Sequence, residues 1–352
     1  MIDIVCAGDV VLRMAPEQPD GCSGEVPRKC EAGAMGFAIS GSAAVTGIAL
    51  NRLGVFTPIM GRISDDVVGR GVIPTVFREY GGTWQHLHMV RGVKSSYIME
   101  VGGAEPCRIQ SLDAQKEFSS DDIDFNIVSK SRILHIAVSD MMERLIADGA
   151  AELKYIIAKA REAGVAVSLH VEGGLTPETF KTDIAPLADI VVTSSSYIGT
   201  GEMQAVTLYT QALIDAGAKA VAIKVADAGF YVQTSGRIDL KHVAGVGDIN
   251  LENWAGRKLF SPPFKAHGRF AGAADCAVAG MLAGMATGRT IEESVDLACA
   301  ADAFFEMEEQ SVTGIASMEK ITERIENGWD KKPSAVDVGL PYDEALKMYC
   351  AK

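Results

Sequence analysis

Four consecutive residues, Gly272, Ala273, Ala274 and Asp275, stand at the start of an apolar stretch that favours a helix. Backbone N–H groups at a helix N-terminus, together with the helix dipole, can bind the negative charge that develops on a phosphoryl group during transfer. A carboxylate at the position of Asp275 can accept the proton of an attacking hydroxyl group. An aspartate that only caps its helix is the alternative. The residue types therefore point to phosphoryl transfer and leave the capping interpretation open.

A second set of residues could contact a ligand from the first third of the chain. Gly41 precedes a run of small and apolar residues that ends at Gly54, which predicts a helix whose first turn a ligand can approach closely. Tight packing of this helix on a sheet would require the same small residues. Arg13, Arg62 and Arg108 are candidates for binding a carboxylate or phosphate, since guanidinium forks suit such anions, and a surface cation is the alternative for each.

The elements that must position these residues follow a repeating pattern. Apolar residues recur at helical spacing over 150–160, Gly164 ends that helix, and a β-rich run follows over 165–171. The alternation continues with a helix that starts at Thr176, a strand over 190–192, a helix over about 202–215 and a strand over 220–225. Such alternation requires right-handed crossovers and a mostly parallel sheet. We therefore predict a doubly wound α/β fold with helices on both faces of the sheet.

Two regions interrupt this alternation. Residues 12–39 are dense in Pro, Gly and Cys, and residues 86–112 combine β-prone stretches with glycines. We interpret both as strands that project from the main sheet and form a small β lid. The length of 352 residues favours one α/β domain over 1–352 with these lid strands inserted in it.

Composition restricts the class of ligand and the compartment. The formal net charge of −13 and the lack of clustered Lys and Arg argue against a nucleic-acid or membrane surface and favour a small-molecule partner. Seven cysteines without a CxxC pair indicate reduced thiols. Asp3 lies inside the first apolar run, which indicates a strand and not a signal peptide, and the run over 277–286 is too short to span a bilayer. We expect a cytoplasmic protein.

Taken in order, these segments resemble the PfkB (ribokinase) family of carbohydrate kinases, from Gly8 to about Trp329. The likeness is closest to the branch of 2-keto-3-deoxygluconate-kinase-like proteins. The segments that carry it are residues 8–16, 59–69, 254–264, 272–275, 290–293, 314–317 and 327–329.

The resemblance implies ATP-dependent phosphorylation of a hydroxyl group of a sugar or sugar acid, with ATP and Mg²⁺ as cofactors. It implies that Asp275 is the base and that Gly272, Ala273 and Ala274 supply the anion hole. The implied nucleotide-binding residues are Lys224, Ala226, Gly229 and Gly314. The implied substrate-binding residues are Asp9, Arg13, Gly41, Arg108, His170 and Glu172, although the last two could equally form a structural pair at a strand end. Lid strands of this family often pair, which implies a possible homodimer.

Several positions depart from the family pattern. The altered positions are Ala274 and Ala226 in place of glycines, Val45 in place of a sugar-binding Asn, residues 269–271 in place of a Thr-containing pair, and Ser194 and Tyr197 in place of the Asn and Glu of the magnesium motif. Because that carboxylate is missing, we assign no metal ligand. The departures support an alternative, a catalytically impaired protein with the kinase fold that binds a ligand or partner without phosphoryl transfer.

Overall fold

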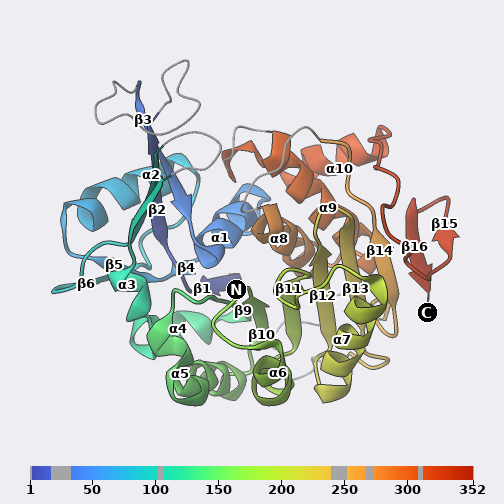
Figure 1. Cartoon of the computed structure of the whole chain (residues 1–352), viewed down its shortest axis with the longest axis horizontal. Coiled ribbons are helices and arrows are strands. Elements are labelled where there is room, and N and C mark those ends of the chain that lie inside the picture. The colour runs from blue at the N-terminus through green and yellow to red at the C-terminus, as the bar shows by residue number, and fades with distance from the viewer. Residues whose placement is uncertain are drawn as a thin grey trace.

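A computed structural model describes residues 2–16, 33–101, 107–238, 252–266, 273–307 and 312–351 of the chain. Its main sheet contains, from one edge to the other, β4 (Ile59–Met60), β1 (Ile2–Ala7), β9 (Ser131–Val138), β10 (Ala166–Val171), β11 (Ile190–Ser194), β12 (Ala220–Val225), β13 (Gly229–Thr234), β14 (Lys258–Ser261), β16 (Met348–Ala351) and β15 (Tyr342–Asp343). Strands β4 to β12 in this order are parallel, and the remaining pairings are antiparallel (Figure 1). The predicted doubly wound, mostly parallel sheet is therefore confirmed, with an antiparallel extension at one edge.

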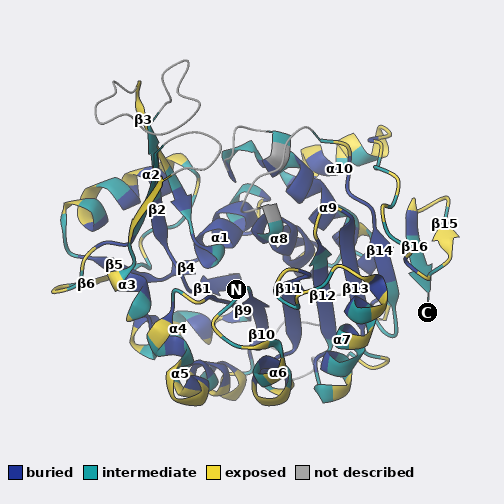
Figure 2. Cartoon of the chain, viewed as in Figure 1, coloured by how far each residue is buried: buried dark blue, intermediate teal, exposed yellow. Residues whose placement is uncertain are grey.

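Helices cover both faces of this sheet, because successive residues of each strand point to opposite sides. In β1, Ile4 and Cys6 pack into one apolar core, and Val5 and Ala7 pack into the other. The first core lies under α1 (Ser42–Arg52), α8 (Ala273–Ala286), α9 (Ile291–Met307) and α10 (Met318–Glu326). The second face carries α4 (Phe125–Val128), α5 (Glu143–Glu162), α6 (Pro177–Thr179) and α7 (Met203–Ala216) (Figures 1 and 2). Strands buried on both faces account for the continuous β-branched runs in the sequence.

The lid is a separate four-stranded sheet at one side of the molecule. Its order is β3 (Met35–Ser40), β2 (Val11–Pro16), β7 (Tyr97–Val101) and β8 (Cys107–Ser111). The prediction that parts of 12–39 and 86–112 leave the main sheet is confirmed for these strands, while residues 17–32 and 102–106 lie outside the described part. One segment differs from the prediction: β6 (His88–Val90) pairs with β5 (Arg62–Ser64) and not with the lid. The remaining short helices are α2 (Ile73–Glu79) and α3 (Asp113–Lys116).

Local signals in the sequence set several element ends. Thr176 accepts the Thr179 N–H and caps α6, and α7 ends at Gly217, whose φ of 127° suits glycine. Thr290 and Glu293 form the reciprocal hydrogen bonds of a capping box at α9. No helix in the described part of the chain is both long enough and apolar enough to cross a membrane.

Candidate active site

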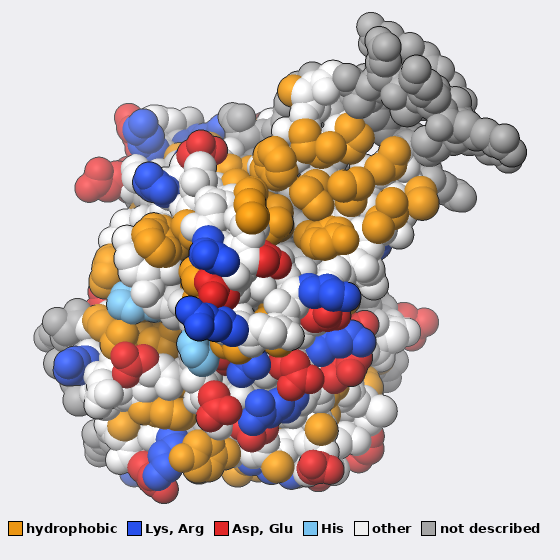
Figure 3. All heavy atoms as spheres, turned by 90° about the vertical axis from the view of Figure 1, so that its left-hand side faces the viewer, with side chains coloured by type: hydrophobic (Ala, Val, Ile, Leu, Met, Phe, Trp, Pro, Cys, Tyr) orange, Lys and Arg blue, Asp and Glu red, His pale blue; other side chains and the backbone are white. Residues whose placement is uncertain are grey.

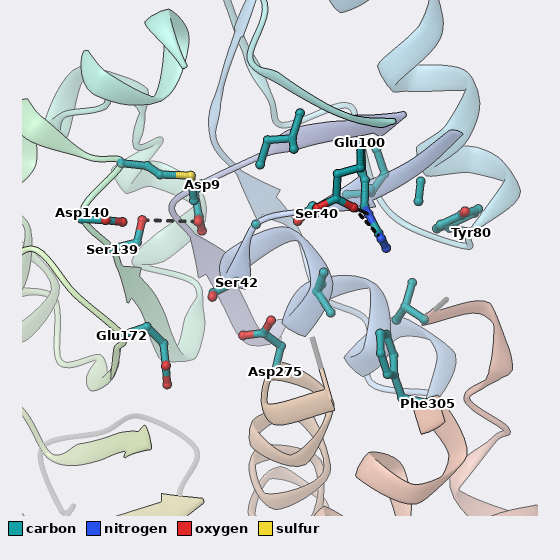
Figure 4. Close-up of a pocket in the computed structure, with 18 of the residues that line it drawn as sticks. Asp9, Ser40, Ser42, Tyr80, Glu100, Ser139, Asp140, Glu172, Asp275 and Phe305 are labelled. Carbon is teal, nitrogen blue, oxygen red and sulfur yellow. Dashed lines mark hydrogen bonds and ion pairs between the residues drawn. The ribbon is translucent and has the colours of Figure 1, made fainter. Parts of the chain in front are cut away.

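A cavity of about 310 Å³ lies between the lid and the carboxyl ends of the parallel strands (Figure 4). Ligands in open α/β sheets bind at this edge, because the loops that leave the strands create a crevice there. Five carboxylates and two guanidinium groups border the cavity: Asp9 after β1, Asp140 after β9, Glu172 after β10, Asp275 in α8, and Glu100, Arg13 and Arg108 in the lid. The topology therefore brings together six of the predicted site residues, namely Asp9, Arg13, Gly41, Arg108, Glu172 and Asp275.

Asp275 is the third residue of α8, so its carboxylate lies in the first turn of a helix of 14 residues. The side chain is 11% exposed and borders the cavity. Among the described residues, nothing donates a hydrogen bond to its Oδ1, so this oxygen does not cap the helix. Ala274 and Ala273 precede Asp275 in α8, and Gly272 lies outside the described residues. The geometry thus fits a carboxylate directed at a ligand better than a capping residue.

Asp9 links the cavity to the start of α1. Gly41 occupies the N-cap position and has no side chain to bind the first amides of the helix. Asp9 replaces that cap, because its Oδ1 accepts the Ala43 N–H at 3.1 Å and its carbonyl oxygen accepts the Ala44 N–H at 3.3 Å. Burial and the charge of Asp275 raise the pKa of Asp9, while the Ala43 N–H opposes this shift. Asp9 and Gly41 both border the cavity.

The lid places two of the three predicted arginines around one carboxylate. Arg13 Nη2 lies 2.7 Å from Glu100 Oε2, and Arg108 Nη2 lies 2.9 Å from Glu100 Oε1 (Figure 4). Burial of Glu100 favours its protonated form, but both arginines outweigh burial and lower its pKa. The prediction for Arg62 is wrong: its guanidinium is buried against Asp122, and Arg62 does not border the cavity.

His170 and Glu172 lie in different positions relative to the cavity. Glu172 borders the cavity, whereas His170 lies behind it with a side chain that is only 1% exposed. The His170 ring bridges Glu172, at 2.8 Å, and Asp275, at 3.3 Å. His170 is therefore in contact with the candidate base and not with the cavity.

The comparisons with known proteins concern the whole chain. No protein-family model matches it, and no curated protein matches it. Among solved structures, it is similar to fructokinase from Xylella fastidiosa with bound ATP, with a TM-score of 0.69 and 17% identity over 92% of this chain and 98% of that one. A putative ribokinase II from E. coli in complex with ATP and Mg²⁺ gives a TM-score of 0.71 and 14% identity over 93% of this chain and 100% of that one. Arabidopsis thaliana ribokinase complexed with ribose and ATP gives a TM-score of 0.68 and 17% identity over 92% of this chain and 98% of that one. The fold is ribokinase-like.

Within this ribokinase-like fold, the predicted nucleotide-side residues lie away from the described cavity. Lys224 in β12 forms an ion pair with Asp302 of α9, and both side chains are largely buried. Ala226 has a φ of 39°, a conformation that favours glycine, and begins the turn into β13. A Cβ on Gly229 would approach the Ser261 carbonyl oxygen to 2.3 Å, which shows that this glycine allows close strand packing. Gly314 ends a short 3₁₀ turn, Val312–Gly314, whose Val312 borders the cavity.

Several cavity residues were missed in the sequence, among them Ser139, Asp140 and Glu100. Ser139 and Asp140 directly follow β9, and the end of a central parallel strand was a usable signal for them. Glu100 gave no such signal, because its place between Arg13 and Arg108 depends on the pairing of β7 with β2 and β8.

The described residues contain no group of three or more His, Cys, Asp or Glu side chains that could hold a metal ion. Magnesium in kinases is bound by substrate phosphates, water and one or two carboxylates, so a preformed protein cage is not required. The oxygen-rich lining of the cavity is compatible with Mg²⁺ that enters with ATP.

Proposed function

We propose that this chain is an ATP-dependent carbohydrate kinase that phosphorylates a hydroxyl group of a sugar or sugar acid. The observation that carries the proposal is Asp275, whose carboxylate lies in the first turn of α8 and borders the same cavity as Asp9 and the lid arginines. The fructokinase and ribokinase with similar structures were solved with ATP, and one also with ribose, which supports a sugar and a nucleotide as ligands.

In the proposed reaction, Asp275 accepts the proton of the substrate hydroxyl group. The hydroxyl oxygen forms a bond to the γ-phosphorus of ATP, the bond from that phosphorus to the oxygen bridging to the β-phosphate breaks, and ADP leaves. The first amides of α8, including that of Ala274, stabilise the charge on the transferring group. Mg²⁺, when bound with ATP, neutralises charge on the phosphates.

The cavity supports a polar substrate with two different ends. Carboxylates at the strand ends, such as Asp9, accept hydrogen bonds from hydroxyl groups. Arg13 and Arg108 at the lid end suit a carboxylate, which favours a sugar acid. This end of the cavity supports the assignment to the 2-keto-3-deoxygluconate-kinase-like branch, which we propose from the sequence motifs.

A homodimer formed through the lid strands is also part of the proposal. Strand pairing places Phe37, Met14, Met99 and Ile109 in one row across the face of the lid opposite the cavity. Phe37 is 42% exposed and Ile109 51% exposed, and an apolar patch is visible on this side of the molecule (Figure 3). An exposed apolar patch of this kind suits a protein interface. We also propose a single domain over 1–352 and a cytoplasmic location.

The first test is thermal unfolding with ATP, with and without Mg²⁺, because a ligand that binds only the folded state raises the midpoint. A screen of sugars and sugar acids for ADP release follows, with Asp275→Asn as the inactive control. We expect stabilisation by ATP and turnover that requires Asp275. No stabilisation by any nucleotide and no turnover would refute the kinase. Stabilisation without turnover would favour the impaired, ligand-binding alternative.

A further inference from the structure

A buried histidine lies between two carboxylates in the wall behind the cavity. His170 Nε2 lies 2.8 Å from Glu172 Oε1, and His170 Nδ1 lies 3.3 Å from Asp275 Oδ1. Within the described part of the chain, His170 Nδ1 and Asp275 Oδ1 are both buried and have no aligned hydrogen-bond partner. Two buried polar atoms that face each other at this distance are one small rotation away from a hydrogen bond. Asp275 is therefore in contact with a buried histidine through Oδ1.

The groups around His170 favour its protonated form. Burial opposes a charge on the ring, but the nearby Asp275 carboxylate and the hydrogen-bonded Glu172 carboxylate outweigh burial and raise the pKa of His170 to about 10. A further titratable group beside the ring is His135 on β9, with ring centroids 6.3 Å apart. Burial and the charge of His170 lower the pKa of His135 to about 3, so His135 is neutral. Asp275 in turn faces Asp9, whose pKa is raised by burial and by the charge of Asp275.

Glu172 fixes the ring from the side opposite Asp275. Its Oε2 accepts a hydrogen bond from Ser194 Oγ at 3.0 Å, and Ser194 Oγ lies 2.7 Å from Ser196 Oγ. The chain of contacts thus runs from β11 through Glu172 and His170 to the first turn of α8. Each polar side chain in it restricts the orientation of the next one.

We propose that His170 is a positioning residue for Asp275, which it holds at Oδ1 so that Oδ2 is directed at the substrate hydroxyl group. The inference rests on the proposed kinase function. His170 keeps its own proton during the reaction, because the hydroxyl proton goes to Asp275 and is later released to solvent. This role replaces the sugar contact predicted for His170.

The kinetic test compares His170→Asn with His135→Asn as the matched control. Both variants remove a buried histidine from adjacent strands, but only His170 touches a carboxylate. We expect His170→Asn to lower kcat about tenfold with little change in KM, because the substrate contacts remain and only the orientation of the base is lost. His135→Asn should leave both constants close to those of the wild-type protein. A rise in KM with an unchanged kcat for His170→Asn would overturn the proposal.

A second test does not depend on activity or on the folding of His170→Asn. The chain has six histidines, so labelling the imidazole Cε1 with ¹³C gives six NMR signals to follow with pH. We expect the His170 signal to titrate well above pH 8 in the wild-type protein and about one unit or more lower in Asp275→Asn and in Glu172→Gln. Titration near pH 6.5, or no change in Asp275→Asn, would refute the contact whatever the activity. If the wild-type protein phosphorylates nothing, the kinase proposal fails and the NMR titration alone decides the coupling.

Discussion

Replacing Gly41 by alanine tests the connection between the start of α1 and the floor of the cavity. Gly41 has a φ of 99°, and a Cβ there would lie 2.5 Å from the Asp9 carbonyl oxygen and 2.8 Å from the Asp9 carbonyl carbon. The backbone conformation alone costs a residue with a Cβ about 1–2 kcal/mol. Relief of the contact must shift Asp9, which adds about 1–3 kcal/mol of overpacking and about 1 kcal/mol for the weakened cap on Ala43. We expect Gly41→Ala to destabilise the fold by about 3–6 kcal/mol.

Gly54→Ala is the matched control. Gly54 has a φ of 93°, but a Cβ there would have no neighbouring atom within 4 Å. This variant should therefore lose only the conformational part, about 1–2 kcal/mol. Urea unfolding followed by circular dichroism gives both values, and ligand titration of the folded fraction should show weaker binding for Gly41→Ala alone. Equal destabilisation by the two substitutions would refute the reasoning, because it would show that the contact with Asp9 carries no energy.

Three further predictions concern the charges and the lid. The pKa of His170 is raised from 6.5 to about 10, so its stabilising charge is fully present below about pH 6.5 and is lost as the pH rises toward 10. The thermal midpoint of the wild-type protein should therefore fall over this pH range more steeply than that of His170→Asn. Parallel plots of thermal midpoint against pH for the two proteins would contradict the raised pKa. Glu100→Gln removes the charge that neutralises Arg13 and Arg108 in the lid, so KM for a carboxylate substrate should fall severalfold with little change in kcat. An unchanged or higher KM would argue against a substrate anion at the lid end of the cavity. Phe37→Glu should convert the proposed dimer to a monomer in sedimentation velocity. Phe56→Glu, at a 58% exposed position outside the lid, should leave the dimer intact. A dimer that survives Phe37→Glu would exclude this face of the lid as the dimer interface.

Much of the fold was predictable from local patterns. The helical spacing before Gly217 and the β-branched run over 220–225 correctly predicted α7 and β12, because each signal lies within one element. For α5 the prediction covered only 150–160, whereas the element runs over Glu143–Glu162 and has a non-helical backbone at 147–150. The lid strands were recognised as separate from the main sheet, but their order was not, because β2 pairs with β7 more than 80 residues away and no local pattern encodes such a partner.

Six of the predicted site residues border the cavity, but the contacts among them were not predictable from the sequence. The alternation of a strand places His170 and Glu172 on the same side, which was readable from their spacing. The contact between Asp275 and His170 depends on how α8 packs on the sheet. The spacing of residues in the sequence contains no information on that packing. Lys224 shows the same limit, since its partner Asp302 is on a helix far along the chain.

The contacts around Asp275 also change how the departures from the family pattern should be weighed. Ser194 stands where the magnesium motif has another residue, and taken alone it indicates a loss. In the structure Ser194 holds Glu172, which holds His170, which contacts Asp275. Buried charges of this kind cost desolvation energy, and apolar residues of similar size often stabilise a fold as well or better. A chain that had only to keep the fold would gain nothing from placing them at the cavity wall, whereas a base that must be ionised and oriented requires them. The balance therefore favours a rebuilt catalytic site over an eroded one, and turnover that requires both Asp275 and His170 is the measurement that separates the two.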